Sequence, residues 1–216
     1  MQADNQGLNT KTHCLSIAYL GPIEYYAILA NSSKILLEQH ESYIKQSYRN
    51  RCSIATANGI MNLTIPVEKH TKSKAIIKDV RISYHGNWNE QHWKSIESAY
   101  NSSPFFEYYE DELRAIYNKR WIFLWDFNLA LQQKALELLD VEPIIQCTDK
   151  YEKECPDPYI DLRDRIHPKN EMYLKGLKPY YQVFINKHNF TPNLSIIDLL
   201  MNMGNESIMI LKNSNQ

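Results

Sequence analysis

Residues 14–37, CLSIAYLGPIEYYAILANSSKILL, contain the pattern that decides the predicted fold. Apolar runs at 14–18 and 35–37 are separated by Gly21-Pro22 and by apolar residues at helical spacing: Ile23, Tyr26, Ala27 and Ala30. Proline suits the first turn of a helix, because its missing N–H would be unpaired there. A helix between two apolar runs is typical of a crossover between parallel strands. The stretch therefore predicts a βαβ unit.

The next stretch predicts a β-hairpin. Two runs, Cys52–Ala57 and Ile60–Val67, flank Asn58-Gly59, the pair that most readily adopts the positive φ values of a type I′ turn. The β-branched stretch Ile76–Ile82 predicts a further strand. Because hairpin strands are antiparallel and the first two strands are parallel, we expect a mixed β-sheet.

The second half of the chain is mainly helical in pattern. Three amphipathic stripes, typical of helices that cover a sheet or one another, begin in turn at Trp93, Phe106 and Leu124. A further helix is predicted over residues 195–204, with Ser195 and Asp198 as its capping pair.

The remaining segments complete the predicted domain. Residues 143–179 hold five of the nine prolines and predict a long excursion or lid, whereas 180–185 and 207–211 predict strands. We therefore expect an α/β fold in which a mixed sheet packs with about five helices. The predicted organisation is a flexible leader over residues 1–12 and a single domain over residues 13–216.

Composition excludes several classes of protein. The 216 residues carry 24 Lys and Arg against 25 Asp and Glu, and the net charge of -1 gives no field that would attract nucleic acid. No apolar run approaches the ~18 residues that a membrane helix needs, and no signal peptide is visible at the N-terminus. The four cysteines form no C-x-x-C pair, which favours free thiols in a cytoplasmic protein.

The first candidate site is a basic segment. No acidic residue occurs between Ser42 and Val67. Because alternate residues of an extended segment share a face, Arg49 and Arg51 are expected to grip phosphate or carboxylate oxygens together. Their neighbours complete the predicted binding surface: Lys45, Tyr48 and Asn50. The alternative of equal weight is a solvated strand whose cations neutralise acids elsewhere.

A second candidate follows the second predicted strand, at the edge where open α/β sheets bind ligands. Here Glu38 and Glu41 flank His40, and carboxylates stabilise the charged form of a histidine that acts as acid or base near neutral pH. Tyr19, after the first strand, is expected to line the same edge. A surface histidine among acids has the same pattern, so this alternative stays open.

A third candidate runs from His85 to Trp93. Its residues include His92, a second candidate general base, and Trp88, which is expected to stack on a sugar or base or else to anchor the core. The spacing of His85 and His92 matches no zinc motif.

Other charged clusters are interpreted as structural. The acids near Cys147 and Cys155 are typical of a solvated loop and not of a metal site. A run of alternating charge predicts an ion-pair ladder or a lid over an anion: Asp161, Arg163, Asp164, Arg165 and His167. No dinucleotide, P-loop, nucleophile-elbow or H-E-x-x-H motif occurs, so we expect no cofactor and no metal.

Four segments resemble a known family in order along nearly the whole chain: YLGPIEYY at 19–26, YRNR at 48–51, SAYNSSPFF at 98–106 and NLSIIDLL at 193–200. Through them the sequence resembles the WbqC-like protein family and is similar to its branch in Bacteroidales bacteria. Many members carry Gln-Pro-x-Tyr-Leu-Pro-Trp near the start, where this chain has SIAYLGP at 16–22. The family takes its name from a gene of surface polysaccharide (O-antigen) clusters, so the resemblance implies cytosolic glycan metabolism in a bacterium.

Two functions are expected from these features. The first is an enzyme that transfers a small group to a sugar or nucleotide-sugar. In this case Arg49 and Arg51 are expected to bind phosphate. Either His40 or His92 is expected to act as general base, and Glu38 is expected to orient that base. The second is a non-catalytic module that binds a partner protein or glycan precursor through aromatic and basic side chains. In the first case the expected partner is a small anionic ligand, and neither nucleic acid nor a membrane span is expected.

Overall fold

The predicted βαβ unit is confirmed in the computed structural model, which describes residues 11–69 and 75–214. Strand β1 (Thr12–Ser16) leads through helix α1 (Ile23–Asn31) to strand β2 (Lys34–Glu38), and the two strands are parallel. Pro22 has an extended backbone and comes immediately before α1, as its missing N–H allows. Residues 1–10, which make up most of the predicted leader, lie outside the described residues, and Thr12 already belongs to β1.

Two short strands extend this unit into a four-stranded parallel sheet in the order β5-β2-β1-β6. Strand β5 (Ile145–Cys147) and strand β6 (Tyr159–Asp161) both lie within the predicted excursion. Residues 148–158, here called the strap, connect them without a helix. The predicted combination of parallel and antiparallel strands in an α/β fold is confirmed.

The two faces of the parallel sheet have different coverings. Leu15 and Leu37 are paired across β1 and β2 and lie in the main hydrophobic core. Successive side chains of a strand point to opposite faces, so Cys14 and its neighbour Leu36 point away from that core. There they form the floor of a cavity that the strap covers.

The predicted hairpin is also confirmed, as a separate two-stranded sheet. Strands β3 (Arg51–Thr56) and β4 (Gly59–Thr64) are antiparallel, and Gly59 has a φ of 108°, which a residue without Cβ adopts easily. Cys52 and Leu63 pair on the buried face of this hairpin.

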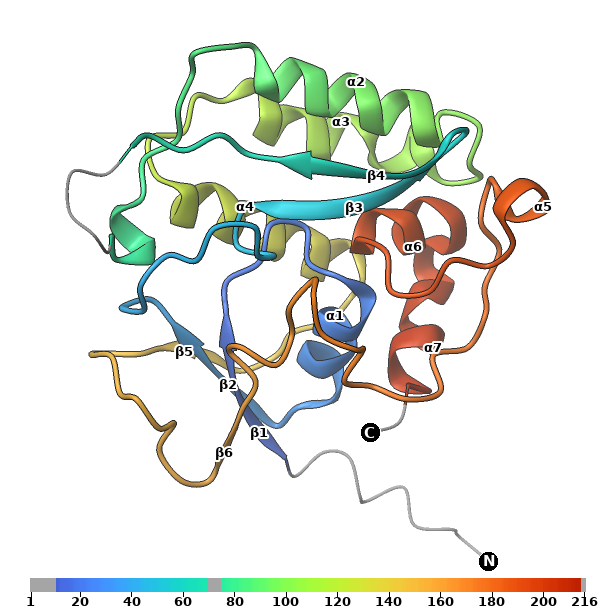
Figure 1. Cartoon of the computed structure of the whole chain (residues 1–216). Coiled ribbons are helices and arrows are strands. Elements are labelled where there is room, and N and C mark those ends of the chain that lie inside the picture. The colour runs from blue at the N-terminus through green and yellow to red at the C-terminus, as the bar shows by residue number, and fades with distance from the viewer. Residues whose placement is uncertain (1–10, 70–74, 215–216) are drawn as a thin grey trace, which may run out of the picture.

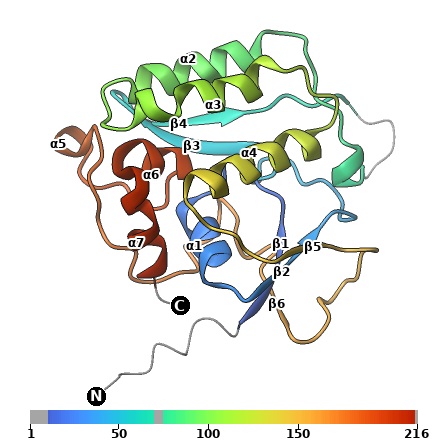
Figure 2. The same cartoon turned by 180° about the vertical axis from the view of Figure 1, so that it is seen from behind.

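The three helices predicted after the hairpin are confirmed as α2 (Trp88–Tyr100), α3 (Phe106–Asn118) and α4 (Leu124–Leu138). Figure 1 shows α2 and α3 side by side above the hairpin, and Figure 2, from behind, shows α4 in front of β3. A single continuous core joins these layers to the parallel sheet. In the described part of the chain, no helix is long and apolar enough to cross a membrane.

The C-terminal part contains α5 (Ile185–His188), α6 (Ile196–Met203), η2 (Gly204–Glu206) and α7 (Ser207–Lys212). The strand predicted over residues 207–211 is wrong, because α7 packs beside α1 and the Asn31 side-chain amide donates to the Leu211 carbonyl at 2.8 Å. The strand predicted over 180–185 is also wrong, since this segment forms turns before α5.

Two further local predictions need correction. Residues 76–82 contain the 3₁₀ helix η1 (Ile77–Asp79) between isolated bridges, and no continuous strand. Ser195 caps α6, where its Oγ accepts from the Ile197 N–H at 3.4 Å. Asp198 does not complete a capping pair, because its carboxylate accepts from three other side chains: Tyr100, Tyr180 and Gln182.

Candidate functional site

The candidate site lies at the carboxyl edge of the parallel sheet, the edge at which β1, β2 and β6 end. From β1 the chain crosses through α1 to β2 on one side, and β6 lies on the other side of β1. Ligands of open α/β sheets bind at such a point, where the chain connections lead to opposite sides of one strand. Ser16 ends β1 and Asp161 ends β6, so the crevice between these two residues is the topologically favoured position.

A buried ion pair lies beside this crevice. Arg49, only 2% exposed, donates through Nε to Glu41 Oε1 at 2.7 Å and through Nη2 to Glu41 Oε2 at 2.5 Å. Its Nη2 also donates to Ser16 Oγ at 2.8 Å. Its other terminal nitrogen, Nη1, has no hydrogen-bond partner in residues 11–69 and 75–214. Burial raises the pKa of Glu41 despite the opposing effect of Arg49.

A second buried arginine, Arg163, fastens the strap to the sheet. Its terminal nitrogens donate to Glu38 and Asp161 at 3.1 and 2.5 Å, and to the strap carbonyls of Glu152 and Lys153 at 2.9 and 3.1 Å. Its Nε also donates to Asp161 at 2.9 Å, so all five guanidinium hydrogens have partners. Although burial opposes the shift, hydrogen bonds from Arg163 lower the pKa of Asp161.

Glu38 lies at the predicted edge, but it does not orient a histidine ring. It accepts from the backbone N–H of His40 at 2.6 Å, from Thr148 Oγ1 at 2.9 Å and from Arg163 Nη1 at 3.1 Å. With these three donors the buried carboxylate is fully engaged. Glu38 therefore lies at the strand end, as predicted. It was expected to contact the ring of His40, but it contacts the backbone N–H of that residue instead.

The expectation that Arg49 and Arg51 share one extended face is wrong. The backbone turns through residues 45–50, where Gln46 has a φ of 58°, so Arg49 lies in a turn and Arg51 opens β3. Arg51 donates instead to Thr64 Oγ1 at 3.3 Å. The two guanidinium groups therefore have different surroundings, and a shared phosphate clamp is not formed.

The residues between these arginines have structural contacts. Asn50 donates from its side-chain amide to the Ile65 carbonyl at 2.9 Å, and the Tyr48 carbonyl accepts from the Tyr19 N–H at 2.8 Å. These bonds fasten the basic segment to the hairpin and to the end of β1. The segments 19–26 and 48–51, two of those that carry the family resemblance, thus meet at this edge.

His92 lies in an aromatic cluster on α2. Its Nδ1 is 2.9 Å from the Tyr19 hydroxyl, which is 2.6 Å from the hydroxyl of Tyr117. Burial lowers the pKa of His92 to about 4, so the ring is neutral at neutral pH. Trp88 packs edge-on against His92 and is 5% exposed. His92, Trp88 and the Tyr19 side chain therefore line neither of the two hollows described next.

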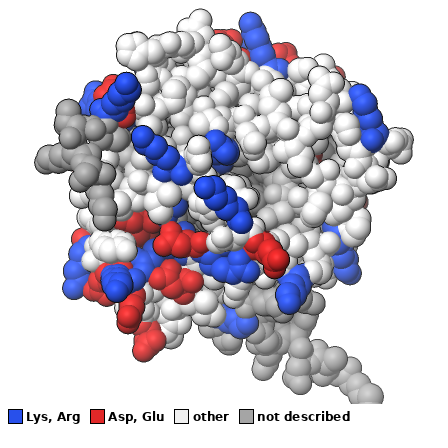
Figure 3. Space-filling model, viewed as in Figure 1, with Lys and Arg blue, Asp and Glu red and all other residues white. Residues whose placement is uncertain are grey.

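A cleft of about 570 Å³ opens at the carboxyl edge. Its walls come from residues 41–45, from the strap, and from the segment after β6; the lining residues are Glu41, Ser42, Tyr43, Ile44, Lys45, Tyr151, Lys153, Asp161, Arg163 and Asp164. Of the residues predicted to bind substrate, only Lys45 lines this cleft. Figure 3 shows charged side chains of both signs gathered on the lower half of this face, while the upper half is mostly uncharged.

A smaller cavity of about 240 Å³, here called the strap cavity, lies between the parallel sheet and the strap. Its lining includes Cys14, Glu38, Cys147, Cys155 and Arg163. Arg163 lines both the strap cavity and the cleft. Within the described ranges, no group of three or more histidine, cysteine or acidic side chains is arranged to hold a metal ion.

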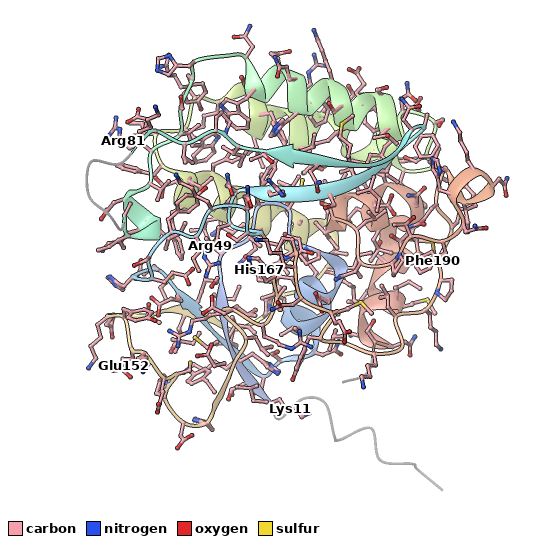
Figure 4. The ribbon with its side chains drawn as sticks, viewed as in Figure 1. Lys11, Arg49, Arg81, Glu152, His167 and Phe190 are labelled. Atoms are coloured by element: carbon pink, nitrogen blue, oxygen red, sulfur yellow. The ribbon has the colours of Figure 1, made fainter. Side chains whose placement is uncertain are left out.

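His167 and Asp164 belong to the charge run after β6. Asp164 Oδ1 lies 3.6 Å from Arg49 Nη2, and Figure 4 shows His167 next to Arg49 in the middle of the face. Burial, and then the charge of Arg49, lowers the pKa of His167. Of the predicted ion-pair ladder, the pair between Asp161 and Arg163 is present. Arg163 has a further acidic partner in Glu38, which lies 125 positions earlier in the chain. No local pattern in the sequence indicated that contact or the pairing of Arg49 with Glu41.

Fold and site together describe an α/β protein with a small-molecule-sized cleft at the carboxyl ends of a parallel sheet. The chain belongs to the WbqC-like protein family, whose model matches residues 18–182 and 169–210. It is similar to the uncharacterized protein Rv1507c of Mycobacterium tuberculosis (strain ATCC 25618 / H37Rv), with 25% identity over 211 residues, 85% of this chain and 89% of that protein. No solved structure matches the chain.

Proposed function

We propose that the cleft binds a small anionic sugar derivative, such as a nucleotide-sugar, and that the protein transfers a small group to it in the biosynthesis of bacterial surface polysaccharide. The polysaccharide setting rests on the family. The observation that carries the binding proposal is the cleft itself: its volume of about 570 Å³ is in the range of ligand pockets, roughly 300–1,000 Å³.

The charges of the cleft favour an anion. Glu41 is paired with Arg49, and Asp161 is paired with Arg163. Lys45 and Lys153 line the cleft and have no ion pair among residues 11–69 and 75–214. These two ammonium groups are available to a phosphate or pyrophosphate, for which lysine is a common ligand.

The aromatic side chains of the cleft favour a sugar or base. Tyr43 lines one wall and Tyr151, on the strap, lines the other, and Tyr151 is 53% exposed. An exposed aromatic ring offers an apolar face for a sugar or base and a hydroxyl for hydrogen bonding. Asp164, exposed at the rim, can accept hydrogen bonds from sugar hydroxyls.

His40 is assigned the role of general base. This residue follows β2 at the carboxyl edge, and its backbone is fixed by Glu38. His40 is not itself a lining residue of the cleft, but it is the chain neighbour of the lining residue Glu41, and its ring has no hydrogen bond to any described residue. His92 is the weaker of the two predicted bases, because it is buried in the aromatic cluster and its pKa is about 4.

Calorimetric titration with a panel of nucleotide-sugars, free nucleotides and sugar phosphates tests the binding proposal. We expect at least one nucleotide-sugar to bind, and the double variant K45A/K153A to bind it at least tenfold more weakly. Lys94→Ala, an exposed change on α2, is the matched control and should leave binding unchanged. If no member of the panel binds at millimolar concentration, the proposal fails.

Turnover separates the enzyme from the binding module. Incubation of the bound nucleotide-sugar with candidate acyl, methyl or amino donors should give a product whose formation is abolished by His40→Ala and retained by His85→Ala. His85 is an exposed histidine that precedes α2, so it controls for loss of an imidazole. Tight binding without any turnover would instead favour the non-catalytic module for a glycan precursor.

A further inference from the structure

Three of the four cysteines meet around the strap cavity. Cys14 comes from the middle of β1, Cys147 from the end of β5, and Cys155 from the strap. The fourth, Cys52, is buried on β3. Neither the proposed binding of a sugar derivative nor its modification uses any of these thiols.

Two of the three thiols interact. Cys14 and Cys155 line the same cavity, and after burial the interaction with Cys155 is a further cause of the raised pKa of Cys14. Cys14 is completely buried in the sheet, whereas Cys155 is partly exposed, so one member of the pair is reachable by a small oxidant and the other is protected. The guanidinium of Arg163 lines the same cavity and favours the thiolate of both.

We propose that Cys14 and Cys155 form a redox modification site, in which hydrogen peroxide joins them as a disulfide between β1 and the strap. In the first step the Cys155 thiol loses its proton, the resulting thiolate attacks one peroxide oxygen, the O–O bond breaks, and the leaving hydroxide takes up the proton, so that Cys155 sulfenic acid and water are formed. In the second step the Cys14 sulfur attacks the sulfenic sulfur, the S–O bond breaks, and the disulfide and a second water are formed. The two thiols are oxidised by two electrons and one peroxide is reduced.

The surroundings also set the rate of this oxidation. Burial raises the pKa of Cys155 above its ordinary value and raises that of Cys14 further, so little thiolate is present at neutral pH. Oxidation is therefore expected to be slow at pH 7 and to become faster as the pH rises. This behaviour distinguishes a slow sensor or protective pair from a catalytic thiol.

The disulfide would anchor the part of the strap that lines the cleft. Arg163 already holds the carbonyls of Glu152 and Lys153, and the cross-link would add a covalent bond at residue 155. Tyr151 and Lys153 are cleft residues close to that bond along the chain. Any effect of oxidation on ligand affinity rests on the proposed function, whereas formation of the disulfide does not.

The experiment treats the reduced full-length protein with hydrogen peroxide, alkylates the remaining thiols, and maps the tryptic peptides without reduction. Cleavage at lysine and arginine places the four cysteines in separate peptides: 12–34, 52–69, 135–150 and 154–163. We expect free thiols to fall from four to two per chain, peptides 12–34 and 154–163 to be joined, and the reaction to be faster at pH 8.5 than at pH 7. The joined peptides should disappear on reduction.

Single variants make the test specific. Cys155→Ser should abolish the cross-link, and it changes a partly exposed residue that the fold does not bury. Cys147→Ser is the matched control, because Cys147 lines the same cavity and should not be needed. A cross-link of Cys147 to Cys155, a cross-link only between two chains, or retention of all four thiols at millimolar peroxide would overturn the proposal.

Limited digestion of the folded protein provides a second readout. Lys150 and Lys153 are the trypsin sites of the strap, and the Lys150 side chain is 77% exposed. Oxidised wild-type protein should be cut there at least several-fold more slowly than reduced protein, and Cys155→Ser should show no difference. Equal rates for oxidised and reduced wild-type protein would contradict anchoring of the strap, whatever the ligand of the cleft.

Discussion

Arg49 and Glu41 form a bidentate ion pair, in which Nε and Nη2 of the guanidinium meet the two carboxylate oxygens at 2.7 and 2.5 Å. Both side chains are almost fully buried. Removing one partner of such a pair leaves an unpaired buried charge, whereas removing both leaves none.

We therefore predict that Arg49→Met destabilises the protein by about 3–5 kcal/mol. The double variant R49M/E41L should recover most of this loss. Urea unfolding of Arg49→Met, Glu41→Leu and the double variant measures the free energy of unfolding and the coupling between the two residues. Additive losses would show that the pair contributes no coupling.

Arg163, which follows β6, is predicted to hold the strap as well as to stabilise the fold, because Arg163→Met also leaves the buried Glu38 carboxylate without its cation. Arg163→Met removes two hydrogen bonds to the strap carbonyls of Glu152 and Lys153. Amide exchange over residues 148–158 should then become at least tenfold faster, as local opening becomes easier. Arg165→Met, which removes a bond from an exposed arginine to the Glu171 carbonyl, is the matched control and should leave the strap unchanged.

Acid should weaken the fold through His92. Because burial lowers its pKa from 6.5 to about 4, the unfolded chain binds a proton in this interval that the folded protein does not. The contribution of His92 to the free energy of unfolding is fully present above pH 6.5. It falls as the pH drops toward 4, by roughly 3 kcal/mol at most. Unfolding by urea at several pH values should show that His92→Gln has a shallower decline than wild type between these limits.

Asp198 should act in the opposite direction. Burial raises its pKa, even though hydrogen bonds from Tyr180, Tyr100 and Gln182 favour the charged form. The contribution of Asp198 to the free energy of unfolding is therefore greatest below pH 3.8. It declines as the pH rises through the raised pKa of the folded protein. Asp198→Asn should remove this decline but cost about 1–3 kcal/mol near neutral pH, because three donors then face a group with one acceptor oxygen. A variant as stable as wild type at neutral pH would contradict this account.

The sequence predicted best those elements whose causes are local. Asn58-Gly59 fixes a two-residue turn by its own backbone preference, and the helical spacing after Pro22 fixes α1. The run at 207–211 was misassigned because a short apolar stretch suits a buried helix as well as a strand, and contact with α1 decides. Strands β5 and β6 have three residues each, too few to show a period.

The candidate site depended on contacts that local patterns do not contain. Lys45 and the carboxyl edge were predicted from charge and topology, and both belong to the cleft. The pairing of Arg49 with Arg51 assumed an extended backbone, which the turn at Gln46 replaces. The partners of Arg163 come from positions as far apart as Glu38 and Lys153, so only the folded chain brings them together.

The position of β6 beside β1 also has a consequence for how the chain is made. Thr12 is paired with Tyr159, so during translation β1 lacks one neighbour until Tyr159 has left the ribosome. Pairing over such sequence separations slows folding, and an uncovered strand edge is prone to association with other chains. We therefore expect the nascent N-terminal part to be most prone to aggregation before β6 has been made.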